Sequence, residues 1–219
     1  MSRSDSRYHH GDLASALETA ADSLLAERGA ASLSLREVAR RAGVSHNAPY
    51  HHFADRHALL ERLGIRHMTR LVEAQQSAGD RESDARAAFV AIGAAYVGYA
   101  HEHPHGFAIV FDPEVCIPGH TSPEMSALIA RNEALIGDVI ARVSPGLTDE
   151  ELAAAVIGAW GAAHGLAQLV AAGHVPRSFL MAPRWLEQMS DVTQAFPDAP
   201  VFVAPEPVLA GVTGFHLHR

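Results

Sequence analysis

The sequence predicts an all-α protein, with an N-terminal three-helix helix-turn-helix domain at residues 1–66 and a C-terminal helical domain at residues 67–219. Two observations predict this class. Apolar residues recur at spacings of three and four in almost every segment before Phe196, as they do on the buried face of a helix. Proline and glycine fall between these segments, and no segment alternates apolar and polar residues strongly enough to predict a strand.

The first predicted helix begins near Asp12, a candidate N-cap, and ends at Gly29. Glycine often follows the last turn of a helix because it readily adopts the left-handed conformation that such a stop requires. The apolar residues between these two positions share one face, which predicts an amphipathic helix of about four turns. They are Leu13, Leu17, Ala20, Ala21, Leu24 and Leu25.

Two shorter helices are expected next. Ser34 and Glu37 have the spacing of a capping box, in which each side chain accepts a hydrogen bond from the other residue's backbone N–H. That helix should end at Gly43, and Ser45 is a candidate N-cap for the following one. Pro49 removes one amide donor from this third helix, which is a small loss near a first turn. Its expected core-facing residues are Ala48 and Phe53.

A fourth helix is expected to begin after Asp55, its candidate cap, and to run towards Ser77. Beyond it, prolines mark the breaks between elements. From Pro197 onward, four prolines and few charges predict an extended arm packed on the body. Further helices are predicted at residues 83–102, 105–111, 123–143, 148–172 and 180–195.

Charge is distributed unevenly along the chain. All 17 cationic side chains are Arg, and the formal net charge is −8. Residues 1–66 carry nine Arg, eight acidic residues and six His, whereas residues 67–219 carry eight Arg and seventeen acidic residues. An anionic partner is therefore expected to contact the first part of the chain.

Two features predict the cellular location. The sequence has a single cysteine, Cys116, and residues 1–10 lack the apolar stretch of a signal peptide, so we expect a cytoplasmic protein. Residues 152–176 contain no Arg, Asp or Glu and are long enough to span a membrane. Ala and Gly dominate this segment, however, and small residues let helices approach closely. It is therefore interpreted as a buried packing helix, with no membrane partner.

The two short helices joined by residues 42–44 form a helix-turn-helix pattern, in which the second helix can enter the major groove of DNA. Several motifs follow one another in order around it: Ala21 and Leu25 before Gly29, then Ser34-Leu-Arg-Glu-Val-Ala39, Ala42-Gly-Val-Ser45, Tyr50-His-His-Phe53, Asp55-Arg56 and Leu59-Leu60. With these motifs, residues 13–63 resemble the N-terminal domain of the TetR family of bacterial transcriptional regulators.

The resemblance implies contacts with double-stranded operator DNA. The hydroxyl groups of Tyr50 and Ser45 and the charge of Arg56 suit phosphates. His46, Asn47 and His51 are candidates for base edges, and Asn47 could pair with adenine or could only solvate the first turn of its helix. The candidate DNA-binding residues are Arg36, Ser45, His46, Asn47, Tyr50, His51, His52 and Arg56.

The sequence departs from the family pattern at four positions. Leu25 and Ala30 stand where the family usually has aromatic residues, Leu33 where it often has Thr, and Arg56 where it usually has Lys. Arg in place of Lys keeps the charge and adds a planar fork of donors. These departures concern packing or single phosphate contacts, so the expected function is unchanged.

Later in the chain, Trp160, His164 and Gly165 resemble the Trp-His-Gly (WHG) pattern of one C-terminal subclass of the family. Trp160 and His164 are four residues apart and share a helix face. They could line an effector cavity, or they could fill the core with a hydrogen-bonded imidazole. The candidate ligand-binding residues are Tyr96, Phe107, Phe111, Met125, Trp160 and His164.

The leading hypothesis is a repressor released from DNA by a small-molecule effector. A homodimer through residues 148–172 and 180–195 would hold two recognition helices about 34 Å apart, one turn of DNA. An activator or a ligand-free regulator has the same sequence features, and a helical small-molecule-binding protein with a vestigial DNA motif is the alternative from another class. No residue pattern predicts an enzyme, a cofactor or a metal site, the last including the run His101, His103 and His105.

Overall fold

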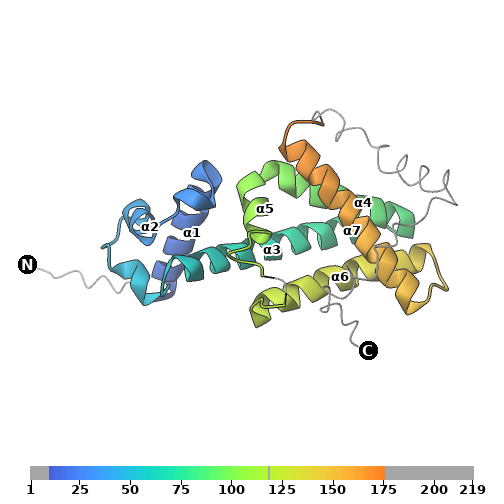
Figure 1. The fold of residues 1–219 in the computed structure, drawn as a ribbon, viewed down its shortest axis with the longest axis horizontal. Coiled ribbons are helices and arrows are strands. Elements are labelled where there is room, and N and C mark those ends of the chain that lie inside the picture. The colour runs from blue at the N-terminus through green and yellow to red at the C-terminus, as the bar shows by residue number, and fades with distance from the viewer. Residues whose placement is uncertain (1–9, 118, 176–219) are drawn as a thin grey trace, which may run out of the picture. The chain divides into compact units, whose positions relative to one another are not determined.

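The computed structural model describes residues 10–117 and 119–175, and every regular element in these ranges is helical, which confirms the expected all-α class (Figure 1). The predicted helix at residues 180–195 and the predicted arm after Pro197 lie outside the described residues. In chain order the elements are α1 (His10–Arg28), the 3₁₀ helix η1 (Ala30–Ser32), α2 (Leu35–Ala42), the 3₁₀ helix η2 (Ala48–His51), α3 (Arg56–Gly79), α4 (Ala85–Glu102), α5 (Pro104–Val110), α6 (Pro123–Val143) and α7 (Asp149–Ala171).

Most helix ends lie where local side-chain chemistry predicts them. Thr148 and Glu151 form a complete capping box at the start of α7. The carboxylate of Asp55 accepts a hydrogen bond from the backbone N–H of Ala58 at 2.9 Å, so the predicted cap of α3 is confirmed. The prediction for Asp12 is wrong, because α1 already begins at His10 and Asp12 lies within its first turn.

The chain divides into two compact units, of which the first contains described residues 10–70 and 102–116. In it α1 packs against α2 and α5. The predicted apolar face of α1 is confirmed, since Leu17 and Leu25 are fully buried, and Phe53 is buried as expected. The unit includes residues 102–116, so it is not identical to the domain predicted at residues 1–66, whose boundary stays a prediction.

A buried polar network joins α1 to α3 inside the first unit. Asp22 accepts a hydrogen bond from His67 at 2.8 Å and another from Arg70 at 2.8 Å, and His67 is only 4% exposed. Burial by itself raises the pKa of Asp22, but the hydrogen bonds and charges of His67 and Arg70 outweigh it and lower the pKa to about 2. From α5, Gly106 packs directly against the ring of His67.

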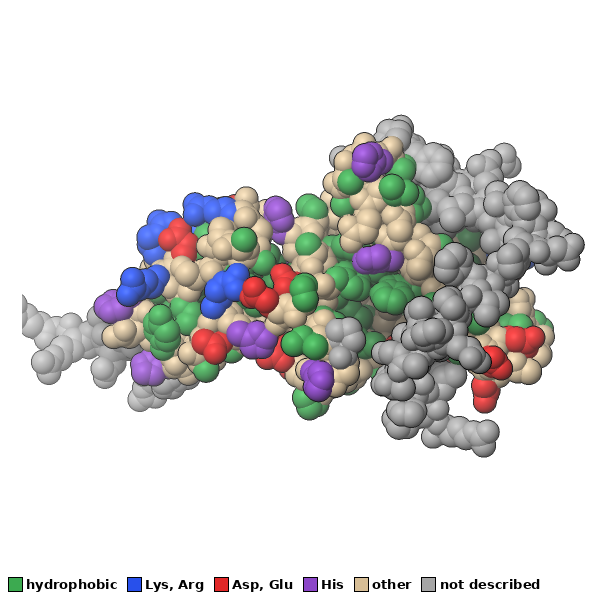
Figure 2. All heavy atoms as spheres, in the orientation of Figure 1, with side chains coloured by type: hydrophobic (Ala, Val, Ile, Leu, Met, Phe, Trp, Pro, Cys, Tyr) green, Lys and Arg blue, Asp and Glu red, His purple; other side chains and the backbone are tan. Residues whose placement is uncertain are grey.

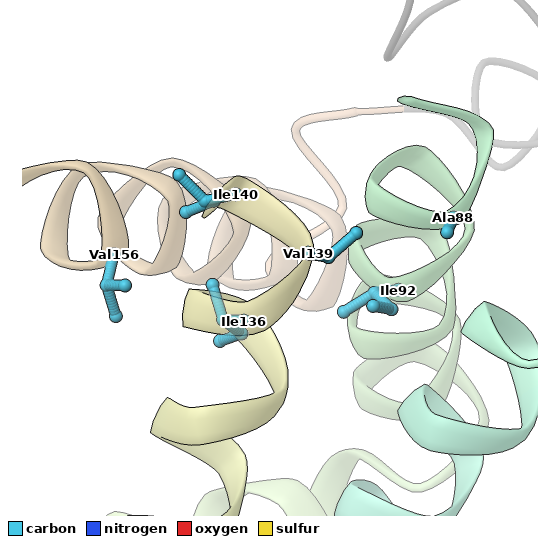
Figure 3. Close-up of a cluster of buried hydrophobic side chains, with 6 residues drawn as sticks. All are labelled: Ala88, Ile92, Ile136, Val139, Ile140 and Val156. Carbon is cyan, nitrogen blue, oxygen red and sulfur yellow. The ribbon is translucent and has the colours of Figure 1, made fainter. Parts of the chain in front are cut away.

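The second unit contains described residues 71–101, 117 and 119–175, with its core where α4, α6 and α7 meet. Figure 3 shows this cluster, to which α6 contributes the most side chains. The helices are held together by apolar burial, at about 25 cal/mol per Å² of apolar surface. The buried members are Ala88, Ile92, Ile136, Val139, Ile140 and Val156.

One side of α7 is not covered by the described part of the chain. Ile157, Trp160 and Leu169 are each between 38% and 47% exposed. By length and composition α7 could span a membrane, with a mean hydropathy of 1.4 over its most apolar window, of which 17% is buried. Among the described residues, α4 and α6 cover only part of the surface of α7, so the predicted burial of this helix is not complete within residues 10–117 and 119–175.

Candidate functional site

The first helix of the helix-turn-helix has the predicted boundaries. Ser34 caps α2 by accepting a hydrogen bond from the backbone N–H of Glu37 at 3.3 Å. Gly43 ends the helix in the left-handed conformation, with φ 69°, and its N–H reaches the last carbonyls. The predicted capping box is only half formed. Its other bond would join the Glu37 carboxylate to the backbone N–H of Ser34, but the carboxylate accepts from the guanidinium groups of Arg28 and Arg40 instead.

The expected third helix is a single 3₁₀ turn, η2, and this corrects two predictions. Its N-cap is Asn47 rather than Ser45, and the residue buried in the core is Pro49 rather than the expected Ala48, which is half-buried. In an α-helix the N–H of residue 49 would bond the carbonyl of Ser45, but proline has no N–H. That carbonyl instead accepts from the N–H of Ala48 at 3.0 Å, which is the shorter 3₁₀ spacing. The loss at Pro49 is therefore large enough to change the helix type.

The candidate DNA-binding side chains around this turn face solvent. Tyr50 is 52% exposed although it is aromatic, and His52 is half-buried between the turn and the core. An exposed turn of this kind, following a capped helix and a glycine turn, is the element that enters the major groove in helix-turn-helix proteins. The other exposed candidates are Arg36, Ser45, His46, Asn47 and His51.

Arginine side chains gather over the first unit on the face shown in Figure 2, but most of them pair with acidic residues. Arg40 binds Glu37, and Arg41 binds Glu27 through two hydrogen bonds of 2.7 and 2.6 Å. Arg36 differs: it is exposed on α2 and has no ion-pair partner among the described residues. Its charge is thus not neutralised by a neighbouring carboxylate.

Arg56, at the start of α3, is held inside the first unit by three hydrogen bonds. Its Nε donates to the carbonyl of Leu33 at 3.1 Å, and one terminal nitrogen donates to the carbonyl of Ala30 at 3.0 Å. The other terminal nitrogen forms an ion pair with Glu114 at 2.7 Å. These bonds use three of the five N–H groups of the guanidinium. Its predicted phosphate contact remains a prediction.

The second unit contains a cavity of about 790 Å³ between α4, α6 and α7, with Gln75 of α3 in its wall. Phe89, Tyr96 and Trp160 are its aromatic residues, and Ala, Gly and Ile residues form most of the rest. A mainly apolar cavity of this size with a few polar groups is typical of a small-molecule site.

Three side chains around the cavity form a hydrogen-bonded chain. The Trp160 indole N–H donates to the Tyr96 hydroxyl at 3.3 Å, and that hydroxyl lies 2.9 Å from Nδ1 of His164. Burial raises the pKa of Tyr96 well above its usual range and lowers the pKa of His164. At neutral pH the chain therefore consists of an uncharged phenol beside an uncharged imidazole.

The structure brings some of the predicted ligand-binding residues together and separates others. Tyr96 and Trp160 line the cavity. His164 is not part of the lining, but it is hydrogen-bonded to the Tyr96 hydroxyl. Phe107 and Phe111 instead pack on each other in the first unit, with ring centroids 5.1 Å apart, and Met125 is buried on α6 outside the lining. Gln75 lines the cavity without having been predicted.

Comparison with known families gives two matches. Residues 18–63 match "Bacterial regulatory proteins, tetR family", and residues 89–192 match "Tetracyclin repressor-like, C-terminal domain". No curated protein matches the chain.

Solved structures with the same fold agree with these matches. A protein of unknown function from Rhodococcus sp. RHA1 is 32% identical in sequence, with a TM-score of 0.72. The match covers 86% of this chain and 96% of the Rhodococcus chain. The TetR family regulator PfmR from Thermus thermophilus is 20% identical, with a TM-score of 0.51, and the match covers 83% of this chain and 92% of PfmR. FadR from Bacillus subtilis, solved in complex with stearoyl-CoA, is 14% identical, with a TM-score of 0.57, and the match covers 77% of this chain and 94% of FadR.

A capped helix, a glycine turn and an exposed second turn on an all-helical body define a DNA-binding transcriptional regulator. The chain belongs to the TetR family of these regulators.

Proposed function

We propose that the chain is a dimeric repressor that binds operator DNA in the cytoplasm and is released by a small-molecule effector. Residues 1–66 are assigned to DNA binding, and residues 67–219 to effector binding and dimerisation. The observation that carries the proposal is the separation of an exposed helix-turn-helix in one unit from an apolar, aromatic-lined cavity in the other. A ligand that favours one separation of the two recognition helices would release DNA by shifting populations.

Within the DNA-binding part, Arg36, Tyr50 and Arg56 are assigned to phosphates, with Ser45 and His52 beside them. His46, Asn47 and His51 are assigned to base edges, because their side chains are exposed around η2. The free charge of Arg36 supports the first assignment.

The effector site is assigned to the cavity lined by Tyr96 and Trp160. The hydrogen-bonded chain to His164 supports both readings of the WHG resemblance, since it fixes the ring orientations and also forms part of the wall. In this interpretation Phe107, Phe111 and Met125 have packing roles.

Dimerisation is assigned to the exposed side of α7. A Cβ atom added at Gly161 or Gly165 would meet nothing within 4 Å, so these small residues leave room for a second helix at close range, whereas the open space at Gly158 is that of the cavity. The exposed Ile157 and Leu169 would supply apolar contacts. We favour a protein partner over a membrane because the family consists of DNA-binding regulators.

A test combines footprinting with a transcriptional reporter. The protein should protect a palindromic site in the DNA upstream of its own gene or of a neighbouring one, with half-sites about one helical turn apart. Deleting the gene should raise expression from that promoter. A fall in expression would identify an activator, and absence of protection on any neighbouring promoter would contradict local control.

A further inference from the structure

Glu114 lies in a turn that follows α5 and belongs to the first unit, although it is distant from the helix-turn-helix in sequence. The carboxylate of Asp112 accepts a hydrogen bond from the backbone N–H of Glu114 at 2.8 Å, and the carbonyl of Asp112 accepts from the N–H groups of Val115 and Cys116. Val115 is buried. The position of Glu114 is therefore fixed by the hydrogen bonds of the turn and by the burial of its neighbour.

From this turn the Glu114 carboxylate reaches the guanidinium group of Arg56, which is 58 residues away in sequence. Its Oε2 accepts from one terminal nitrogen, Nη1, at 2.7 Å. The two side chains are 39% and 61% exposed, so water and ions have access to the pair. An exposed ion pair contributes little to stability and is weakened by salt, so this one can open without loss of the fold.

The other two bonds of Arg56 do not depend on Glu114. They are donated by Nε and by the second terminal nitrogen to the backbone carbonyls of Leu33 and Ala30, in the segment between α1 and α2. A carbonyl is neutral, so it orients the guanidinium group without cancelling its charge. A carboxylate cancels it, and Glu114 thus reduces the charge that Arg56 presents to an anion.

A carboxylate and a phosphate are alternative partners for the same guanidinium nitrogen, because arginine binds both through the same fork of donors. A phosphate that binds Nη1 of Arg56 must displace the Glu114 oxygen that now lies 2.7 Å from it. A phosphate that uses the remaining N–H groups lies beside the same carboxylate, and like charges repel each other. Glu114 therefore opposes a phosphate contact by either route.

We propose that Glu114 competes with DNA phosphate for Arg56, so that it lowers the affinity of the protein for DNA and makes this affinity less dependent on salt. Its effect is independent of DNA sequence, because phosphate contacts carry no base information. This inference rests on the proposed phosphate contact of Arg56 and adds the residue that limits the strength of that contact.

The test measures binding of the full-length protein to a fluorescein-labelled DNA duplex of random sequence, by fluorescence anisotropy at several salt concentrations. Glu114→Gln keeps the length of the side chain and removes its charge, so this variant should bind about twofold to fivefold more tightly than the wild type. The slope of log affinity against log salt should become steeper by up to about 0.9 per protomer, because one more cation is available to displace counterions.

Glu102→Gln is the matched control for net charge. Glu102 is an exposed acidic residue at the other end of the segment 102–116 of the first unit, so its substitution makes the same change in charge away from the turn. This variant should change the affinity and the slope less than Glu114→Gln does. The comparison of the two variants tests the competition even where variants of Arg56 do not fold.

Arg56→Gln separates the inference from the phosphate contact on which it rests. It should weaken binding, and in this background Glu114→Gln should tighten binding no more than Glu102→Gln does, because no guanidinium group remains to be released. Weaker binding by Arg56→Gln together with unchanged or weaker binding by Glu114→Gln overturns the competition and leaves the phosphate contact in place.

Two further outcomes contradict the inference. An equal gain in Glu114→Gln and Glu102→Gln, or a gain from Glu114→Gln that persists in the Arg56→Gln background, overturns the competition, because net charge then accounts for the effect. Unchanged binding by Arg56→Gln overturns both the phosphate contact and the inference built on it.

Discussion

Individual arginines in the first unit differ in how far neighbouring carboxylates neutralise them. Arg40 is paired with Glu37, whereas Arg36, on the same helix, has no partner in the described part of the chain. Arg36→Ala should therefore weaken binding to specific and random DNA alike and reduce the slope of log affinity against log salt by about 0.9.

Arg40→Ala is the control and should change the slope less, since it leaves Glu37 with only its bond to Arg28. The measurement is a fluorescence-anisotropy titration at several salt concentrations. Equal slopes for both variants would show that Arg36 does not contact phosphate.

The ion-pair network around Asp22 makes stability depend on pH. Its pKa falls from 3.8 to about 2 in the folded state, so the folded protein holds the carboxylate more strongly than the unfolded chain does. The resulting stabilisation of about 2 kcal/mol is present above pH 3.8 and is lost as the pH falls towards 2.

Urea unfolding of the wild type and Asp22→Asn at pH 7, 5 and 3 measures this effect. The difference in the free energy of unfolding should be constant from pH 7 to 5 and smaller at pH 3. A difference independent of pH would show that Asp22 stabilises by packing alone.

At the scale of elements, two helical glycines with opposite surroundings test how closely α5 packs. A Cβ at Gly106 would overlap the ring of His67, whereas one at Gly98 of α4 would meet nothing within 4 Å. Gly106→Ala should destabilise the protein by about 1–3 kcal/mol, because His67 cannot keep its bond to Asp22 while it moves aside.

Gly98→Ala should stabilise the protein by about 0.5–1 kcal/mol, because glycine is unfavourable inside a helix. Thermal unfolding of both variants provides the comparison. A neutral Gly106→Ala variant would mean that α5 can shift away from α3 at little cost.

Helix boundaries were predictable because caps and breakers act over three or four residues. The sequence alone places the start of α6 at Pro123 and the start of α7 at Thr148, and the structure agrees within one residue. The 3₁₀ type of η2 differs from the helix that the family pattern predicts, because Pro49 has no N–H to bond the carbonyl of Ser45.

Partners of a buried face were harder to predict. Periodicity shows that Phe107 faces inward, but it does not show which helix it meets. The pair of Phe107 and Phe111 lies in the first unit rather than at the cavity. Gln75 escaped notice because a glutamine on an amphipathic helix is most often at the surface. The available signal is that the residues three and four positions before Gln75 are apolar, so that Gln75 continues the buried face of α3.

For the molecule as a whole, the exposed side of α7 predicts that association and DNA recognition depend on each other. Gly161→Leu should leave the single chain folded, because residue 161 is exposed and a Cβ atom there meets nothing within 4 Å, but it should block a second helix. Sedimentation at micromolar concentration should show a dimer for the wild type and for the control Gly161→Ala, and a monomer for Gly161→Leu.

The monomeric variant should lose specific DNA affinity far more than nonspecific affinity, because one half-site replaces two. A dimer that persists in Gly161→Leu would place the interface elsewhere.

The three bonds of Arg56 bear on the entropy of the phosphate contact proposed for it. A flexible cationic side chain loses rotamer freedom when it binds a phosphate, at a cost of about 0.5–1.5 kcal/mol. The carbonyls of Ala30 and Leu33 and the carboxylate of Glu114 already fix this guanidinium in the free protein. If Arg56 contacts a phosphate as proposed, this part of the entropic cost has been met by folding, and two N–H groups of the guanidinium are left for the contact. A lysine here would carry the same charge, but its ammonium would have to be ordered anew at each encounter with DNA.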